Sequence, residues 1–322
     1  MTDHSPSRCV SLGVAGLSVS RIGFGTSKLF RLQTSRQRQR VLDAAFDAGI
    51  RHFDTARMYG LGMAERELGR FLARHRGAVT VATKFGIPVS KTGSFLRPIQ
   101  GLVRRMVGAM PGVQRRLRKR PSPLMAARCF DLGMARMCLE TSLRELGVGT
   151  IDIFYLHEPN AQSAIPDGME AFLAAARDRG DIRAWGVSGR LSEVLPVQAV
   201  RPGLVQVLQH ASDAISMAAE PALPQLPRIT YAPFADALDR IAATWDSSAE
   251  AALAWERDLG LPRNRDSLAA ALLAHALAAD VPVVFSTTRA ESIGPLVTAA
   301  MRPDTRTLGQ SLLHWLTAHL PS

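Results

Sequence analysis

Four side chains suited to moving protons each stand in or just after a short apolar run. Asp54 and Tyr59 lie five positions apart in FDTARMYG (53–60), Lys84 lies late in VTVATKF (79–85), and His157 closes IDIFYLH (151–157). Taken singly, such residues have ordinary roles, as a helix cap, a packed ring or a solvated charge. A charged side chain within an apolar run is costly to bury unless it is paired. We therefore expect Asp54 to lie beside Lys84.

The chemistry that this group predicts is protonation of a carbonyl oxygen. A free phenol has a pKa of about 10, and a nearby ammonium group lowers that pKa by favouring the phenolate. Lys84 would thereby make Tyr59 a usable proton donor, while Asp54 holds the lysine charged and oriented. His157 would donate a hydrogen bond to the substrate oxygen and fix its position. Such a site protonates the oxygen while another group delivers hydride to the carbon.

The elements that must position these residues alternate between strand and helix patterns, as in parallel β/α units. Strands are predicted at 21–25, 51–55, 79–85, 151–157, 184–188, 204–209, 228–232 and 281–286. Helices are predicted at 35–49, 64–75, 132–147, 169–180, 267–280 and 291–300, with a further amphipathic helix at 308–320. This order predicts an α/β fold, a (β/α)8 TIM barrel of parallel strands with a C-terminal helix, whose catalytic groups lie at the carboxyl ends of the strands.

A barrel would bring the four side chains together, because neighbouring strand ends lie about 5 Å apart. The rival architecture is a doubly wound dinucleotide-binding fold, which requires GxGxxG between its first strand and helix. GVAG (13–16) precedes the first predicted strand, and GFG (23–25) lacks a third glycine at the required spacing. The rival is therefore disfavoured.

Length and composition are compatible with one large barrel or two smaller domains, since the chain has 322 residues and is 47% hydrophobic. The first residues, MTDHSPSR, do not resemble a signal peptide, and the longest apolar region (267–285) is interrupted by His275, Asp280 and Pro282. The three cysteines have neither CxxC spacing nor an even count, which favours a reducing compartment. We expect a cytoplasmic protein with no membrane span and no metal site.

The net charge of +11 is concentrated in one segment. Between Gly86 and Arg128 there are ten Lys or Arg residues and no Asp or Glu. This segment forms a basic insertion at about 87–128, after the third predicted strand and on the catalytic rim. Three interpretations stay open: a solvated loop, a lid whose cations attract an anionic substrate, and a short amphipathic helix that contacts an anionic membrane or polyanion. We expect no nucleic-acid partner.

Five motifs of this chain, in matching order, closely resemble those of the aldo-keto reductases: GFGTS (23–27), FDTARMYG (53–60), ATKFG (82–86), LETSLRELGVGTIDIFYLHEP (139–159) and GVSG (186–189). The resemblance implies one barrel domain over residues 1–322 that binds a nicotinamide dinucleotide without a Rossmann fold. It also implies a catalytic tetrad of Asp54, Tyr59, Lys84 and His157.

The resemblance further implies the cofactor contacts. Ser188 and Gln209 would hydrogen-bond the nicotinamide carboxamide, and Tyr231 would stack on the nicotinamide ring, with barrel packing as its alternative role. Gly25 and Thr26 fall in the loop that lines the cofactor. The residues expected near the 2′-phosphate are Ser286, Thr287, Thr288 and Arg289.

This chain departs from the family pattern at several cofactor positions. Gly189 stands where the family often has Asn, Ser286 and Ser292 stand at commonly basic places, and Pro295-Leu296 replaces an acid-amide pair. Arg289 is the remaining local cation, and a 2′-phosphate needs strong cationic partners. NADP is therefore only slightly favoured over NAD.

The predicted function is reduction of an aldehyde or ketone, or oxidation of the corresponding alcohol or lactol, with Tyr59 as general acid and base. Sugars, pyridoxal-like aldehydes and small ketones are all candidate substrates, because specificity is set by rim loops such as 28–31, the insertion and the segment after Tyr231. The alternative is a barrel that binds the cofactor for a regulatory role with little or no turnover.

Overall fold

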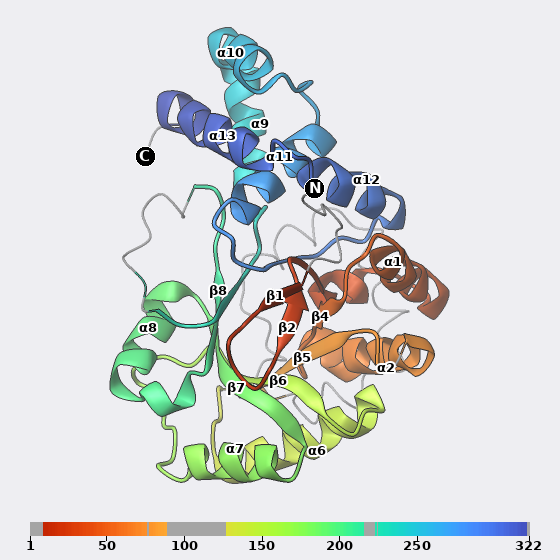
Figure 1. The fold of residues 1–322 in the computed structure, drawn as a ribbon, viewed down its shortest axis with the longest axis vertical. Coiled ribbons are helices and arrows are strands. Elements are labelled where there is room, and N and C mark those ends of the chain that lie inside the picture. The colour runs from red at the N-terminus through yellow and green to blue at the C-terminus, as the bar shows by residue number, and fades with distance from the viewer. Residues whose placement is uncertain (1–8, 76, 89–126, 216–222, 224, 321–322) are drawn as a thin grey trace.

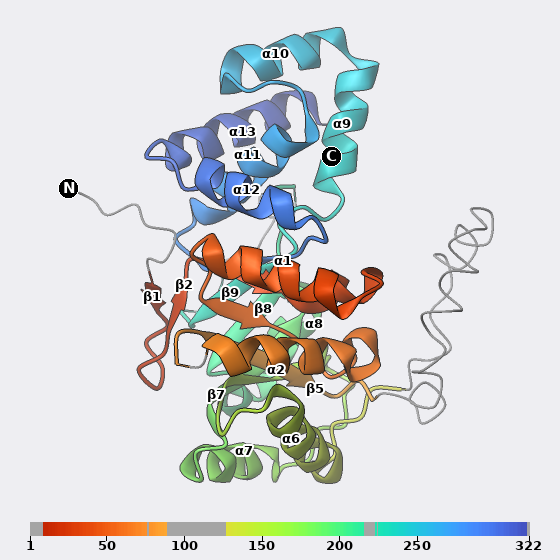
Figure 2. The same cartoon turned by 90° about the vertical axis from the view of Figure 1, so that its right-hand side faces the viewer.

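The computed structural model describes residues 9–75, 77–88, 127–215, 223 and 225–320. Eight parallel strands close into a barrel in the order β10-β3-β4-β5-β6-β7-β8-β9 (Figures 1 and 2). The strands are β3 (Ile22–Gly25), β4 (His52–Asp54), β5 (Thr80–Phe85), β6 (Ile151–His157), β7 (Ile182–Gly189), β8 (Val207–Ala211), β9 (Arg228–Tyr231) and β10 (Val283–Phe285). The predicted (β/α)8 barrel is confirmed.

Helices flank the barrel, and those of residues 237–259 and 305–319 stack beyond the helix of residues 265–277 at the top of Figure 1. They are α1 (Ser35–Asp47), α2 (Met63–His75), α6 (Leu132–Leu146), α7 (Met169–Asp178), α8 (Leu191–Val200), α9 (Ala237–Ser247), α10 (Ala249–Leu259), α11 (Arg265–Leu277), α12 (Ile293–Ala300) and α13 (Thr305–His319). Helix α1 begins with a capping box, in which the Thr34 side chain accepts from Gln37 N and the Gln37 side chain accepts from Thr34 N. Such caps satisfy backbone groups that a helix end leaves unpaired.

The barrel wall contains a close approach that only glycine permits. A Cβ atom added to Gly186 of β7 would lie 1.8 Å from the carbonyl oxygen of Val207 in β8. Gly186 therefore permits the close approach of strands β7 and β8.

An antiparallel hairpin of β1 (Cys9–Ser11) and β2 (Ser18–Ser20) lies at one end of the barrel, on the left in Figure 2. Its residues Leu12, Leu17 and Val19 join a buried cluster with inward side chains of the barrel such as Ile153 and Tyr155. These clustered side chains lie nearer the amino-terminal ends of the strands than the ionisable residues do. The hairpin therefore covers the amino-terminal end of the barrel. The sequence patterns did not predict this hairpin.

Two further regions differ from the expected elements. The run 204–209 was predicted as a strand, but Pro202–Leu204 forms a 3-10 helix and β8 begins only at Val207, because Leu204 N and Val205 N donate to the carbonyls of Arg201 and Pro202. Helices α8, α9 and α10 were also not predicted. Helices α9, α10, α11 and α13 share a second buried cluster centred on Trp255 and Trp315, whose rings meet edge to face with centroids 5.5 Å apart.

The expected basic insertion at about 87–128 lies almost wholly outside the described residues, so its three interpretations stay predictions. Among the helices that the structure describes, none combines the length and apolar character needed to cross a membrane.

Candidate active site

The structure gathers the four ionisable side chains at the carboxyl ends of neighbouring strands. Asp54 is the last residue of β4, Lys84 is next to last in β5, and His157 ends β6. Tyr59 follows β4 in a short 3-10 helix, η2 (Tyr59–Gly62). Parallel pairing of β4 with β5 and of β5 with β6 sets these strand ends side by side. The predicted convergence on one rim is therefore present.

Lys84 and Asp54 form the buried ion pair that the sequence predicted. Only 2% of Lys84 and 5% of Asp54 is exposed. Lys84 Nζ donates to Asp54 Oδ1 and, at 2.9 Å, to the backbone oxygen of Thr55. Burial lowers the pKa of Lys84, while the carboxylate of Asp54 opposes that shift. The pair keeps a positive charge inside a largely apolar barrel, because each charge compensates the other.

The ring of Tyr59 lies between the ammonium of Lys84 and the imidazole of His157. Lys84 Nζ is 5.5 Å from the centroid of the phenol ring. The Tyr59 and His157 rings meet edge to face, with centroids 5.9 Å apart and planes at 83°. The phenol ring thus lies close to one cation and one imidazole at the carboxyl ends of the strands.

The expected lowering of the Tyr59 pKa is wrong for this structure. Burial, followed by the negative charge of Asp54, raises the pKa of Tyr59 well above its usual 10.0. The physical reason is that the ammonium of Lys84 donates to Asp54 and to a backbone carbonyl, so its positive charge is largely compensated before it reaches the phenol. Tyr59 consequently holds its proton throughout the neutral range, which suits an acid.

His157 is almost fully buried and lies among positive charges. Burial, Lys84 and Arg128 together lower the pKa of His157 well below 6.5. The imidazole is therefore neutral at physiological pH. A neutral imidazole can donate one hydrogen bond to a substrate oxygen without adding charge to the site.

Ser188 and Gln209 form a buried hydrogen-bonded chain that reaches the ion pair. Ser188 Oγ donates to Gln209 Oε1 at 2.6 Å, and Gln209 Nε2 donates to Asp54 Oδ2 at 2.9 Å. The sequence pointed to both residues but missed their link to Asp54, because strands β7 and β8 approach β4 only across the closed barrel. The hydroxyl and amide present donor and acceptor groups that fit a carboxamide.

The other predicted cofactor residues are distributed around the same rim. Tyr231 ends β9, is partly buried and packs against the buried cluster inside the barrel, so stacking on the nicotinamide and barrel packing both stay open for it. Gly25 ends β3, whereas the Thr26 side chain is fully buried and donates to Thr55 Oγ1 at 2.7 Å. The Thr26 side chain therefore links the residues that follow β3 and β4, and its contact with the cofactor stays a prediction.

A cation that the sequence analysis did not assign to the cofactor lies beside the segment after β10. Lys28 Nζ donates to the backbone oxygen of Ser286 at 3.1 Å, and burial lowers the pKa of this lysine. Lys28 comes from the 3-10 helix η1 (Thr26–Arg31), so only the barrel closure of β10 against β3 brings it here. Thr287 Oγ1 accepts from Arg289 N at 3.2 Å, and Thr288 is partly buried beside it.

Arg289, the expected local cation, is already paired with acids. Its side chain is 54% exposed and lies 3.4 Å from Asp266 and 3.6 Å from Glu291. Such exposed pairs are weak and can open for a stronger anionic ligand. They nevertheless reduce the net positive charge that a phosphate would meet at this place.

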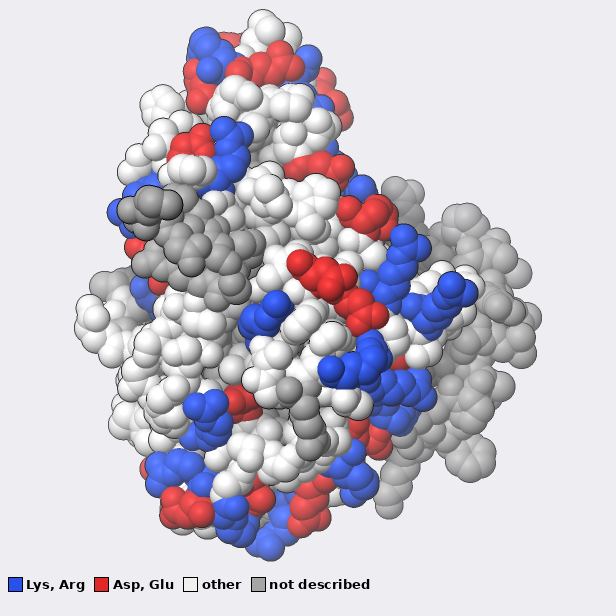
Figure 3. Space-filling model, turned by 45° about the vertical axis from the view of Figure 1, so that its right-hand side comes forward, with Lys and Arg blue, Asp and Glu red and all other residues white. Residues whose placement is uncertain are grey.

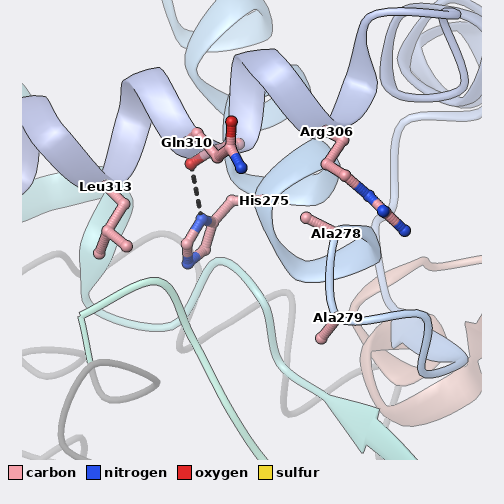
Figure 4. A pocket seen from close by; sticks show the side chains of 7 residues that line it. His275, Ala278, Ala279, Arg306, Gln310 and Leu313 are labelled. Atoms are coloured by element: carbon pink, nitrogen blue, oxygen red, sulfur yellow. Dashed lines mark hydrogen bonds between the residues drawn. The ribbon is translucent and has the colours of Figure 1, made fainter.

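A surface hollow of about 430 Å³ lies elsewhere, between α11 and α13 (Figure 4). His275 lines it and its Nδ1 contacts the Gly309 carbonyl at 2.9 Å, while Arg306 points away and pairs with Asp280 at 2.7 Å. The hollow lies beside the residues that lead into the start of β10, at the opposite end of the barrel from Tyr59. Its polar groups do not converge, so it is not the reactive site.

Within the described ranges, no three His, Cys, Asp or Glu side chains are placed to hold a metal ion. On the face drawn in Figure 3, acidic and basic side chains of the described residues are interspersed.

Comparison with known proteins gives one family match. The model described as the aldo/keto reductase family matches residues 21–210, which include the four ionisable residues together with Ser188 and Gln209. A D-threo-aldose 1-dehydrogenase of a Pseudomonas species is 32% identical over 203 residues, which cover 61% of this chain and 58% of that protein. The matched part thus spans just over half the length of this curated relative.

Solved structures share the fold over nearly the whole chain. An aldo-keto reductase of Bacillus halodurans has a TM-score of 0.69 at 19% identity and covers 95% of this chain and 96% of its own. An aldo-keto reductase of Klebsiella pneumoniae in complex with NADPH has a TM-score of 0.64 at 19% identity, with 98% of this chain and 96% of its own covered. At such identities the likeness shows the fold alone.

Proposed function

We propose that this chain, which belongs to the aldo/keto reductase family, transfers hydride between a nicotinamide dinucleotide and the carbonyl carbon of a small substrate. The observation that carries the proposal is the packing of Tyr59 between Lys84 and His157, with Asp54 paired to the lysine. Such an arrangement offers a protonated acid, a nearby cation and a neutral hydrogen-bond donor to one oxygen atom.

In the reductive direction the substrate oxygen accepts hydrogen bonds from the hydroxyl of Tyr59 and from His157. When bound, the nicotinamide supplies hydride to the carbonyl carbon. Tyr59 transfers its proton to the oxygen, so the product is an alcohol and the phenol becomes phenolate beside Lys84. The ammonium stabilises that phenolate, and Asp54 keeps the ammonium in place. In the oxidative direction the phenolate of Tyr59 takes the hydroxyl proton of the alcohol or lactol.

Residues of this chain fit the nicotinamide group. Ser188 and Gln209 are buried at the ends of β7 and β8 and offer a hydroxyl, an amide N–H and an amide oxygen. A carboxamide needs both donors and acceptors, so these two side chains can hold it once their mutual hydrogen bond opens. Tyr231 would cover one face of the ring.

For the rest of the cofactor we propose that Lys28 and the hydroxyls of Ser286, Thr287 and Thr288 contact phosphate oxygens. Arg289 would contact a 2′-phosphate after it separates from Asp266 and Glu291. The need for that separation makes the preference for NADP over NAD small. We therefore propose that both cofactors are used, with NADP slightly favoured.

The substrate that we propose is a hydroxylated aldehyde or the lactol form of a sugar. Glu158 directly follows His157, accepts from Arg128 at 2.9 Å and shares that arginine with Glu193 at 3.8 Å. These charged groups at the end of β6 can hydrogen-bond substrate hydroxyls close to the reacting carbon. The name of the relative that is 32% identical, a D-threo-aldose 1-dehydrogenase, agrees with this substrate class.

The test is a turnover assay with purified protein, with NADPH or NADH plus aldehydes and ketones, and with NADP or NAD plus aldoses and simple alcohols. Nicotinamide absorbance reports hydride transfer, and cofactor fluorescence reports binding. We expect turnover of hydroxylated substrates above that of unsubstituted ones. Cofactor binding without turnover of any compound would favour the regulatory alternative, which no feature of the described site supports.

A further inference from the structure

Tyr59 stands on a backbone segment whose conformation must be held by its surroundings. The segment continues the pairing with β5, because Thr55 N and Arg57 N donate to the carbonyls of Ala82 at 2.9 Å and Lys84 at 3.3 Å. The next residues after Tyr59, Gly60 and Leu61, both have left-handed backbone conformations, with φ of +56° and +57°. For a leucine this conformation costs on the order of 1 kcal/mol or more. Contacts outside the turn must therefore stabilise it.

Glu65, in the first turn of α2, is placed to provide such contacts. Its side chain is fully buried, with an exposed fraction of 0%. Oε1 accepts from Thr83 Oγ1 at 2.8 Å and from Ser142 Oγ at 2.7 Å, while Oε2 accepts from a guanidinium nitrogen of Arg57. One carboxylate thus joins the Tyr59 segment to β5 and to α6. Thr83 directly precedes Lys84, and Arg57 lies two residues before Tyr59. Two of the residues that contact Glu65 are therefore close in sequence to Lys84 and Tyr59.

The contact with Arg57 is the one that depends on the negative charge of Glu65. Both oxygens of ionised Glu65 accept, and their partners are two hydroxyls and one guanidinium. A glutamine can keep its oxygen toward the guanidinium and its amide N–H groups toward the two hydroxyls, which also accept, but it loses the negative charge that strengthens the contact with Arg57. Because Arg57 lies two residues before Tyr59, loss of its anchor would free the turn that carries the phenol.

We propose that Glu65 is a positioning residue, which acts through Arg57 to fix the phenol of Tyr59 against Lys84 and His157. The catalytic part of this inference rests on the proposed function, since a positioned phenol matters only if it transfers a proton. The structural part, that Glu65 determines where the Tyr59 ring lies, is independent of turnover.

The same helix supplies a matched control two residues further on. Glu67 is also a buried carboxylate, with 3% exposed, and it accepts from Ser35 at 2.7 Å and from Arg38 at 3.2 Å. Gln39 Nε2 donates to its side chain at 3.0 Å. These contacts tie α2 to α1. Glu67 therefore carries a comparable structural load without a contact to the segment that holds Tyr59.

The experiment compares Glu65→Gln with Glu67→Gln in the full-length protein. We expect Glu65→Gln to lower kcat by about 10- to 100-fold, because small misplacements of a reacting group have effects of this size. Cofactor affinity should stay unchanged, and Glu67→Gln should keep kcat within about twofold while losing a similar amount of thermal stability. Equal effects of the two variants on kcat would overturn the proposal.

A second readout does not depend on turnover. The chain has three tyrosines, so carbon-13 labelling of the tyrosine ring gives few NMR signals, and Tyr59→Phe identifies that of Tyr59. Glu65→Gln should shift or broaden this signal, and Glu67→Gln should leave it in place. An unmoved Tyr59 signal would refute the positioning role. If the wild-type protein turns over no substrate but the signal moves as expected, the proposed function fails while the positioning role stands.

Arg57→Met tests the same contact if Glu65→Gln fails to fold. Only 12% of the Arg57 side chain is exposed, and its removal leaves Glu65 with both hydroxyl donors. We expect the same loss of kcat and the same movement of the Tyr59 signal. The double variant should have a kcat no lower than that of either single variant, because both substitutions disrupt the same ion pair between Glu65 and Arg57. Additive losses would contradict action through Arg57.

Discussion

Two parts of the barrel rim differ in how far their charged side chains are exposed to water. At the ends of β4 to β8, Lys84, Asp54, Gln209 and Ser188 form one buried chain of hydrogen bonds. After β10, Arg289 lies on the surface and faces two acids at 3.4 and 3.6 Å. Buried charges interact strongly because water does not screen them, whereas exposed charges are screened. Under the proposed function, the first region would therefore fix the reaction, and the second would only adjust which cofactor is favoured.

The largest expected effect is the loss of the phenol in the buried region. Tyr59→Phe removes the proton donor but keeps the ring against His157, so we expect kcat to fall by about 10²- to 10⁴-fold. Cofactor affinity, measured by fluorescence titration, should stay within about twofold. A variant that retains a near-normal rate would show that Tyr59 is not the acid.

The ion pair beneath the phenol gives the next effect. Asp54→Asn leaves the ammonium of Lys84 buried without its counter-charge, which costs about 3–5 kcal/mol of unfolding free energy at neutral pH. The pKa of Lys84, already lowered by burial, should fall further. The folded variant then binds fewer protons than the unfolded chain, so its deficit should shrink as pH rises. Chemical denaturation at several pH values measures this, and a deficit independent of pH would contradict it.

The pH dependence of the rate separates the two directions of reaction. The pKa of Tyr59 is raised and that of His157 lies well below 6.5, so neither should titrate near neutrality. The reductive rate should be flat there and fall only in alkali, where Lys84 and then Tyr59 lose protons. The oxidative rate, which needs the phenolate, should rise with pH. A reductive inflection near pH 6.5 would argue against a neutral His157.

The smallest effect is expected in the exposed region. Arg289→Ala should lower the ratio of kcat/KM for NADPH over NADH by less than about tenfold, because exposed charge pairs contribute at most about 1 kcal/mol. Asp266→Asn releases one acid from Arg289 and should raise that ratio by a few-fold. If the two variants change this ratio in opposite directions, with little change in thermal stability, Arg289 contacts the 2′-phosphate and the exposed region affects only the choice of cofactor. Changes of the same sign would show that Arg289 does not contact the phosphate.

Sequence patterns predicted the local features of the fold well. Residues 151–157 and 79–85 were predicted as strands from their apolar and β-branched residues, and strands β6 and β5 form there with the expected functional residue near the carboxyl end. The pairing of Lys84 with Asp54 also followed from the sequence, because a lysine inside an apolar run needs a partner. The patterns did not predict the β1–β2 hairpin or helices α8, α9 and α10. Helices α9 and α10 form around Trp255, in a second cluster that no strand pattern signals.

The residue types at the strand ends, and hence the class of chemistry, were determined by the sequence alone. Three features were decided only by the tertiary structure: the reach of Gln209 across the barrel to Asp54, the placement of Lys28 beside Ser286, and the raised pKa of Tyr59. Each depends on distances between segments far apart in the chain and on how much water the closed barrel excludes. The periodicity of a strand indicates neither these distances nor the exclusion of water, whereas the folded barrel determines both.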